Sequence, residues 1–122
     1  MTVVYGIKNC DTMKKAFSWL GEHGVAHRFH DYRKDGLDAD TVRGWCAQVG
    51  WKALVNTRGT TWRKLSPEQQ AIGSDEDAIA LMLEHPSLIR RPVLLTPAGE
   101  LLIGFEPERY EASLNHAEGG QK

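Results

Sequence analysis

The stretch VVYGIKNCDTM, residues 3–13, contains the transition on which the fold and the chemistry of this chain depend. Its first part, Val3 to Ile7, is a nearly continuous apolar run typical of a buried strand, and a helical pattern begins near Asp11. Cys10 therefore lies between a strand end and a helix start, where its sulfur would face backbone N–H groups that lack a partner within the helix. Those donors and the helix dipole favour the thiolate, the nucleophilic form of cysteine. A small buried apolar side chain would suit the position equally well, so reactivity is one of two interpretations.

The composition is that of an ordinary globular protein. The chain has 122 residues, of which 41% are hydrophobic and 25% charged. Fifteen Lys and Arg against sixteen Asp and Glu leave a net charge of −1, which does not favour binding to nucleic acid or to an anionic membrane surface. No apolar stretch approaches the roughly 20 residues that span a bilayer, and no signal segment is evident. We therefore expect a cytoplasmic monomer whose two cysteines are free thiols.

Hydrophobic periodicity predicts the elements of the N-terminal part. We expect a strand over residues 2–7, buried on both faces, and then a helix that Asp11 or Thr12 caps. A second strand is expected over 27–32 and a second helix over 38–48. The apolar faces of the two helices comprise Met13, Ala16, Phe17 and Leu20, and Val42, Trp45, Cys46 and Val49. Cys46 is therefore interpreted as a core residue rather than a thiol that resolves an oxidised Cys10.

Capping signals and turns organise the remainder of the chain. NTRGTT at 56–61 is typical of a polar loop, SPEQ at 66–69 forms a capping box with proline at the first helical position, and SDED at 74–77 starts another helix. Two apolar runs, 93–95 and 101–103, flank a turn with proline and glycine, which predicts a hairpin. A last helix is expected from Glu106 to about Leu114.

The predicted element order is β-α-β-α, a helical insertion, then β-β-α. This order is that of an α/β protein with a thioredoxin-like fold, a mixed four-stranded sheet flanked by helices, with the insertion before the third strand. We expect a single domain over residues 1–115, with the insertion at about 50–88 and a flexible tail at 116–122.

The residues around Cys10 exclude several chemistries. Met13 stands where a C-x-x-C redox pair has its second thiol, and Ala16 stands where a phosphatase-type loop has its arginine. The five histidines have no zinc-like spacing with cysteine, so no metal site is expected. One candidate nucleophile remains.

Basic residues are candidates to assist that nucleophile. Lys8 lies two residues before Cys10, and its charge would lower the thiol pKa if the two side chains are close. Arg58 lies in the polar loop and Arg91 directly precedes Pro92; an arginine beside a thiolate can hold an oxyanion or carboxylate through two hydrogen bonds. Taken singly, each of these side chains is more often a surface charge. Pro92 is a candidate cis-proline, because a cis-proline faces the active cysteine in thioredoxin-like folds.

Four stretches, taken in order, match a known family. They are YGIKNCDTMKKA at 5–16, DYRKDGL at 31–37, NTRGTTW at 56–62 and RPVL at 91–94. Together they resemble the YffB-like branch of the arsenate reductase (ArsC)/Spx family. The resemblance implies a thioredoxin-like fold with a helical insertion, a single catalytic cysteine, and coupling to glutathione or glutaredoxin. Glutathione would be a co-substrate, with no bound cofactor.

The resemblance also implies roles for individual residues. Cys10 matches the cysteine that attacks the arsenic oxyanion, after which glutathione displaces the adduct and glutaredoxin completes turnover. Arg58 matches the loop arginine and Arg91 the arginine before the cis-proline, and both would bind the anion or the glutathione carboxylates. The expected set around the thiol comprises Lys8, Asn9, Arg58, Arg91 and Pro92, with backbone donors from Asp11, Thr12 and Met13.

Two positions depart from the arsenate reductase pattern. Gly104 stands roughly where those enzymes have a third arginine, and Gly6 stands where they have a histidine four residues before the cysteine. A less basic site suits a glutathione mixed disulfide better than a compact, doubly charged oxyanion. We therefore expect a glutathione-coupled thiol reductase that acts through Cys10 on a mixed disulfide or a small oxyanion.

Three alternatives stay open. The first is genuine arsenate reduction with glutathione and glutaredoxin. The second is a Spx-like regulator that binds RNA polymerase without catalysis, which Met13 disfavours because redox-sensing Spx proteins carry a C-x-x-C at this position. The third is a domain in which Cys10 is vestigial.

Overall fold

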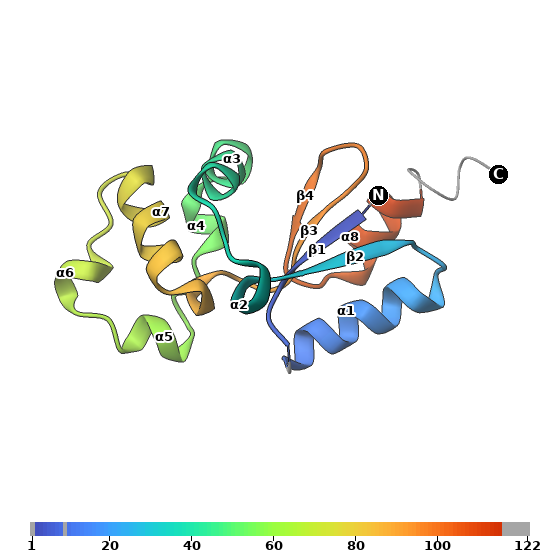
Figure 1. Cartoon of the computed structure of the whole chain (residues 1–122), viewed down its shortest axis with the longest axis horizontal. Coiled ribbons are helices and arrows are strands. Elements are labelled where there is room, and N and C mark those ends of the chain that lie inside the picture. Colours follow the sequence, from blue (N-terminus) through green and yellow to red (C-terminus); the bar gives the residue numbers. More distant parts are fainter. Residues whose placement is uncertain (1, 9, 116–122) are drawn as a thin grey trace. The chain divides into compact units, whose positions relative to one another are not determined.

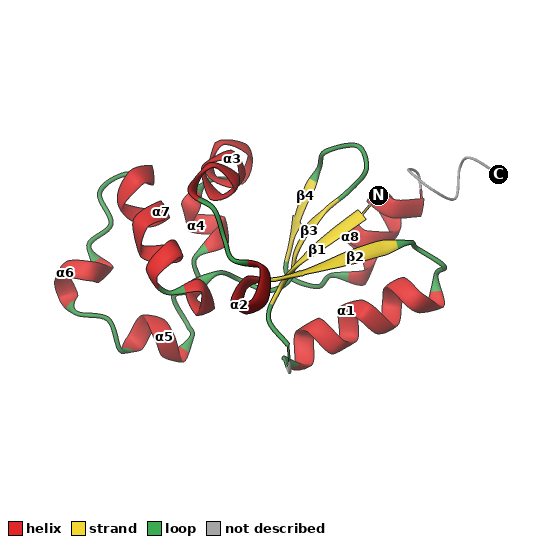
Figure 2. Ribbon diagram, viewed as in Figure 1, coloured by secondary structure: helices red, strands yellow, loops and turns green. Residues whose placement is uncertain are grey.

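The computed structural model describes residues 2–8 and 10–115, and its contacts divide the chain into two compact units. We call Met1–Asp35 with Arg91–Lys122 the sheet unit and Gly36–Arg90 the helical unit. Asn9 and the predicted tail at 116–122 lie outside the described residues. Figure 2 shows that the strands gather in the sheet unit, whereas the helical unit consists of helices and loops.

The sheet unit contains a mixed four-stranded sheet, as the sequence predicts. Its strands are β1 (Thr2–Gly6), β2 (His27–Asp31), β3 (Val93–Leu95) and β4 (Leu101–Ile103). Their order in the sheet is β2-β1-β3-β4, with β1 parallel to β2 and β3 antiparallel to both of its neighbours (Figure 1). The thioredoxin-like fold and the hairpin are thereby confirmed.

The core of this unit lies on one face of the sheet. Helix α1 (Asp11–Glu22), α8 (Pro107–Tyr110) and the π-helical turn η2 (Glu111–Asn115) supply side chains that pack together with strand residues. The core cluster comprises Val4, Met13, Ala16, Trp19, Leu20, Val25, Leu94, Leu102, Tyr110 and Leu114. Burial alternates along β1, where Val3 and Tyr5 are only half-buried, so the expectation of a strand buried on both faces is wrong. The alternation follows from the period of a strand, since successive side chains point to opposite faces.

The start of α1 differs from the sequence prediction in its cap. Cys10 is the N-cap residue, with φ −108° and ψ 130°, and its carbonyl accepts the first helical hydrogen bond from the N–H of Lys14 at 3.0 Å. Asp11 and Thr12 already belong to the helix, so neither caps it. An N-cap requires an extended backbone, and residue 10 is the last residue that has one.

A short helix, α2 (Tyr32–Asp35), ends the first part of the sheet unit, where the sequence indicated the end of a strand and a turn. Local side-chain hydrogen bonds support it. The N–H of Asp31 donates to Asp35 Oδ2 at 3.0 Å, and that of Arg33 to Asp31 Oδ1 at 2.9 Å. Such bonds offer the backbone a turn in place of continued strand pairing.

The helical unit is built from short helices, three of which begin after a residue whose side chain caps them. They are α3 (Ala39–Val49), α4 (Trp51–Leu54), α5 (Thr60–Arg63), α6 (Pro67–Gln70), α7 (Asp75–Glu84) and the 3₁₀ turn η1 (Pro86–Leu88). The predicted capping box at Ser66 is confirmed, as are the starts of α6 and α7. Residues 60–63 form a helix rather than a loop. Gln70 Nε2 donates a hydrogen bond to the Trp62 carbonyl in this helix at 2.9 Å.

The longer helices of this unit pack against each other. Helix α3 contacts α7, and Arg43 on α3 reaches Asp40 at 2.7 Å and Glu76 at 3.1 Å. The contacts place α3 inside the helical unit, which spans Gly36–Arg90, and the insertion expected at about 50–88 stays a prediction. The single-domain expectation itself stays a prediction.

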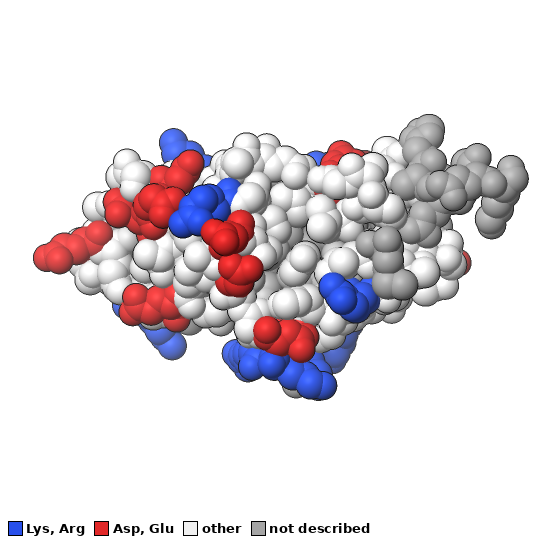
Figure 3. All heavy atoms as spheres, turned by 45° about the horizontal axis from the view of Figure 1, so that its top comes forward, with Lys and Arg blue, Asp and Glu red and all other residues white. Residues whose placement is uncertain are grey.

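Figure 3 shows acidic and basic side chains intermixed on the visible face of the molecule.

None of the helices in the described part of the chain is both long and apolar enough to cross a membrane.

Candidate functional site

Cys10 occupies the turn between β1 and α1 in the sheet unit. It is a free thiol of intermediate exposure that also packs against the core cluster. It is the N-cap residue of α1, and Thr12 and Met13 are the second and third residues of that helix. The N–H groups at these two positions are the ones from which an N-cap side chain can accept a hydrogen bond. The thiol is therefore partly accessible to solvent, and its backbone is fixed at the start of α1.

Its surroundings lower the pKa of the Cys10 thiol overall. Partial burial acts in the opposite direction and is the largest single effect, because it disfavours the charged form. Two backbone N–H groups, those of Met13 and Thr12, lower the pKa, as do the charge and the side-chain hydrogen bond of Arg91. Together these effects outweigh the effect of burial. The Cys10 side chain accepts no capping hydrogen bond, whereas that of Ser66 accepts one from the N–H of Gln69.

Arg91 is the predicted basic residue that the structure brings to the thiol. It is partly buried and lies two residues before β3, and its peptide bond with Pro92 is cis, which confirms that prediction from the sequence. Pro92 is buried, and its carbonyl accepts a hydrogen bond from the N–H of Gly104 at 2.8 Å. Cys10 and Arg91 come from opposite ends of the sequence and meet where β1 ends and β3 begins.

The remaining predicted residues are less closely tied to the thiol. Lys8 is exposed and is not among the groups that shift the pKa of Cys10. Arg58 is exposed in the helical unit, where its N–H donates to Asn56 Oδ1 at 3.1 Å. Asn9 lies outside the described residues. The roles expected for Lys8, Asn9 and Arg58 in binding an anion or glutathione stay predictions.

Gly104 occupies roughly the position of the third arginine of arsenate reductases, and an arginine would not readily fit its backbone conformation. Its φ is +79°, a conformation that L side chains rarely adopt. Its carbonyl accepts a hydrogen bond from the hydroxyl of Tyr110 at 3.1 Å. The backbone here is therefore shaped for glycine, and position 104 contributes no charge to the site.

Tyr32 is a neighbour of Arg91 that the sequence reasoning missed. Burial raises the pKa of its hydroxyl strongly, while the charge of Arg91 partly opposes that rise and Tyr5 adds to it. Tyr32 directly follows β2, at the same edge of the sheet at which Cys10 follows β1. Because β1 and β2 are parallel neighbours, the order of the elements was the signal that could have drawn attention to it.

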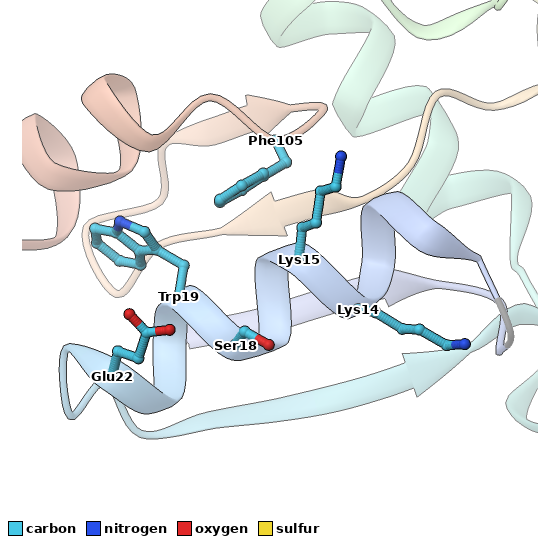
Figure 4. A pocket seen from close by; sticks show the side chains of 6 residues that line it. All are labelled: Lys14, Lys15, Ser18, Trp19, Glu22 and Phe105. Atoms are coloured by element: carbon cyan, nitrogen blue, oxygen red, sulfur yellow. The ribbon is translucent and has the colours of Figure 1, made fainter.

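A separate hollow of about 350 Å³ lies beside α1. Its lining residues are Lys14, Lys15, Ser18, Trp19, Glu22 and Phe105. Figure 4 shows Phe105 reaching toward Trp19, while Lys14 is directed away from both. The lining holds no thiol, so this hollow is distinct in chemistry from the Cys10 site.

Comparison with known proteins identifies the family. The model of the ArsC family matches residues 5–113. The solved structure of a protein named YFFB is 52% identical, covers 93% of this chain and 99% of its own, and superposes with a TM-score of 0.88. The solution structure of an arsenate reductase (ArsC) related protein from Brucella melitensis is 47% identical, covers 93% of both chains, and has a TM-score of 0.73.

A curated relative has a regulatory name. Global transcriptional regulator Spx 2 of Bacillus cereus is 26% identical over 116 residues, which are 93% of this chain and 87% of the relative. These matches confirm the resemblance that the sequence motifs indicated. The chain belongs to the ArsC family.

Proposed function

We propose that this member of the ArsC family is a glutathione-coupled thiol reductase in which Cys10 is the single nucleophile. The observation that carries the proposal is the arrangement of Thr12, Met13 and Arg91 around the thiol, which together lower its pKa. A lowered pKa increases the thiolate fraction near neutral pH, and the thiolate is the attacking species. The partial exposure of Cys10 leaves it accessible to a disulfide.

The reaction follows ordinary thiol–disulfide exchange. The Cys10 thiolate attacks the glutathione sulfur of a mixed disulfide, a new S–S bond forms at Cys10, and the substrate leaves as a thiolate that takes up a proton. A second glutathione thiolate then attacks the glutathione sulfur bound to Cys10. Oxidised glutathione leaves and Cys10 returns to the thiolate. In sum, the mixed disulfide is reduced to a thiol and two glutathiones become one disulfide.

The arginines are proposed to bind the carboxylates of glutathione. Glutathione carries two carboxylates, and a guanidinium can hold each through paired hydrogen bonds. Arg91 already contacts the sulfur site, and Arg58 is the proposed second partner. Glutaredoxin would replace the second glutathione if its own thiolate attacks the adduct, in which case it is a protein partner.

Arsenate reduction is a second candidate because a relative at 47% identity is described as arsenate reductase related. The positive φ of Gly104 weighs against it, since the site lacks the side chain that would add a third positive charge. Arsenate-dependent consumption of reductant, in the presence of glutathione and glutaredoxin, would establish this activity. Its absence together with glutathione adduct formation would favour the first proposal.

A regulatory role is a third candidate because of the curated relative named as a global transcriptional regulator. RNA polymerase would then be the partner, as the family resemblance implies. Met13 leaves this chain without a second thiol at the helix start, so Cys10 has no partner there for a C-x-x-C disulfide switch. A pull-down that retains no polymerase subunit would remove this candidate.

The decisive experiment measures Cys10 in the Cys46→Ala background. The pH dependence of alkylation gives the pKa, and intact-mass spectrometry after incubation with oxidised glutathione detects the adduct. A pKa below the ordinary value of about 8.5, with one glutathione on Cys10, would support the proposal. An ordinary pKa with no adduct would overturn it.

A further inference from the structure

Gly6, at the end of β1, has no room for a side chain. A Cβ placed there would lie 2.5 Å from Met13 Sδ and 2.6 Å from Met13 Cε. Real Cβ atoms do not approach other atoms so closely, so the Met13 thioether occupies the volume that any residue but glycine would need at position 6. Among the glycines that the structure describes, Gly6 has the tightest surroundings.

The requirement for glycine comes from packing rather than from the backbone. Gly6 is not among the glycines with positive φ, so an L residue can adopt its backbone conformation. Met13 is only 1% exposed and belongs to the core cluster together with Val4 and Ala16. The contacted atoms are the far end of the Met13 side chain, so a displaced thioether has to find room among close-packed neighbours.

Displacement of Met13 would be felt at Cys10. Met13 is the third residue of α1, and its N–H is one of the two that an N-cap side chain can receive. The side chain that fills the space over Gly6 therefore belongs to a residue in the first turn of the helix that Cys10 caps. We expect a displacement of this side chain to be transmitted in part to that turn.

We propose that Gly6 is a positioning residue for Cys10, because its missing side chain leaves room for the Met13 thioether against β1 and so keeps the first turn of α1, which Cys10 caps, in place. The inference deepens the proposed function, since it concerns the same thiol. It implies that added bulk at position 6 is tolerated best when position 13 is small.

The test is a double-mutant cycle read out by the pKa of Cys10, from the pH dependence of alkylation in the Cys46→Ala background. Gly6→Ala should raise that pKa by about one unit, the value expected for the weakening of one hydrogen bond to a charged group. Met13→Ala removes the obstructing thioether and should leave the pKa within a few tenths of a unit, while lowering stability through the cavity it creates. The combined variant Gly6→Ala/Met13→Ala should return the pKa to within a few tenths of the parent value.

Gly21→Ala is the matched control, because Gly21 lies in α1 with no atom within 4 Å of its Cβ position. It should leave the pKa unchanged. If Gly6→Ala does not fold, Gly6→Ala/Met13→Leu replaces it: leucine keeps bulk opposite position 6, so its pKa should exceed that of Gly6→Ala/Met13→Ala.

Two results would overturn the proposal. One is an unchanged pKa in Gly6→Ala, even with lowered thermal stability, because the glycine would then be purely structural. The other is a raised pKa that persists when Met13 is also alanine. Both results can be obtained whether or not glutathione reacts, so a missing glutathione adduct would count against the proposed function alone.

Discussion

The two cysteines of this chain lie in two different units and in opposite electrostatic surroundings. Cys10 precedes the first turn of α1 in the sheet unit, where helix N–H groups and Arg91 lower its pKa despite partial burial. Cys46 lies near the end of α3 in the helical unit, where burial raises its pKa and the carboxylates of Asp75 and Glu76 raise it further. Asp75 and Glu76 themselves form the start of α7.

The contrast shows that the pKa of a thiol depends on which part of a helix is near it and which charges neighbour it. At a helix start the orphan N–H groups stabilise an anion, whereas the interior of a helix offers none. Acidic residues suit the start of α7, but the same carboxylates oppose ionisation of the Cys46 that packs nearby. Burial alone does not separate the two sites, because it disfavours both thiolates.

The largest expected effect is the complete loss of chemistry in Cys10→Ser. Hydroxyl oxygen cannot form the mixed disulfide, so intact-mass spectrometry after exposure to oxidised glutathione should show no adduct. Cys46→Ala is the matched control and should keep a single adduct. An adduct that persists in Cys10→Ser and disappears in Cys46→Ala would reverse the assignment of the nucleophile.

The next largest effect is expected for Arg91→Ala, which removes a charge and a hydrogen bond from the thiolate. The pKa of Cys10 should rise by about one unit, so alkylation at a fixed pH below the pKa should slow about tenfold. Arg91→Lys keeps the charge and should recover part of the loss. Arg90→Ala, one residue earlier, is the control and should leave the rate unchanged; equal slowing by both variants would count against a direct contact.

A smaller effect is expected at Arg58. If its guanidinium binds a glutathione carboxylate, Arg58→Ala should slow adduct formation about three- to tenfold without changing the pKa of Cys10, as loss of one partly exposed ion pair would do. Arg63→Ala, an exposed arginine in the same unit, is the control. The same adduct rate in both variants and in the parent would remove the carboxylate role of Arg58.

The smallest effect is a pair of opposite slopes in stability against pH. Cys10 has a lowered pKa in the folded state, so the unfolded chain binds more protons between that pKa and the ordinary thiol value, and stability rises with pH in that window. Cys46 has a raised pKa, so its contribution is present below the ordinary value and is lost as pH rises through its folded pKa. Urea unfolding between about pH 7 and 10 should therefore show a shallower rise for Cys10→Ser and a shallower alkaline fall for Cys46→Ala than for the parent. Identical pH profiles for the two variants would contradict the comparison.

Local sequence signals predicted most of the fold, because caps and periodicity act over a few residues. The spacing of Met13, Ala16 and Leu20 located α1, and Ser66 with Gln69 located α6. The helix at 60–63 was missed because its polar residues carry no hydrophobic period, and it is held instead by a hydrogen bond from Gln70.

The candidate site was only partly predictable. The position of Cys10 follows from neighbouring residues, but its contact with Arg91 joins segments far apart in the sequence and depends on how β3 pairs with β1. The contact of Gly6 with Met13 had one local signal, since a glycine inside a strand often marks a close approach. Which atom approaches it could be known only from the packing of α1.

The boundary between the two units falls between Arg90 and Arg91. All groups that lower the pKa of Cys10 thus belong to the sheet unit, and the helical unit ends one residue before Arg91. Substitutions on the surface of the helical unit, where the proposed glutathione ligand Arg58 lies, therefore leave in place the groups that lower the pKa of Cys10. If Arg58 binds the substrate as proposed, specificity and thiol acidity are encoded in different segments of the chain and can change independently.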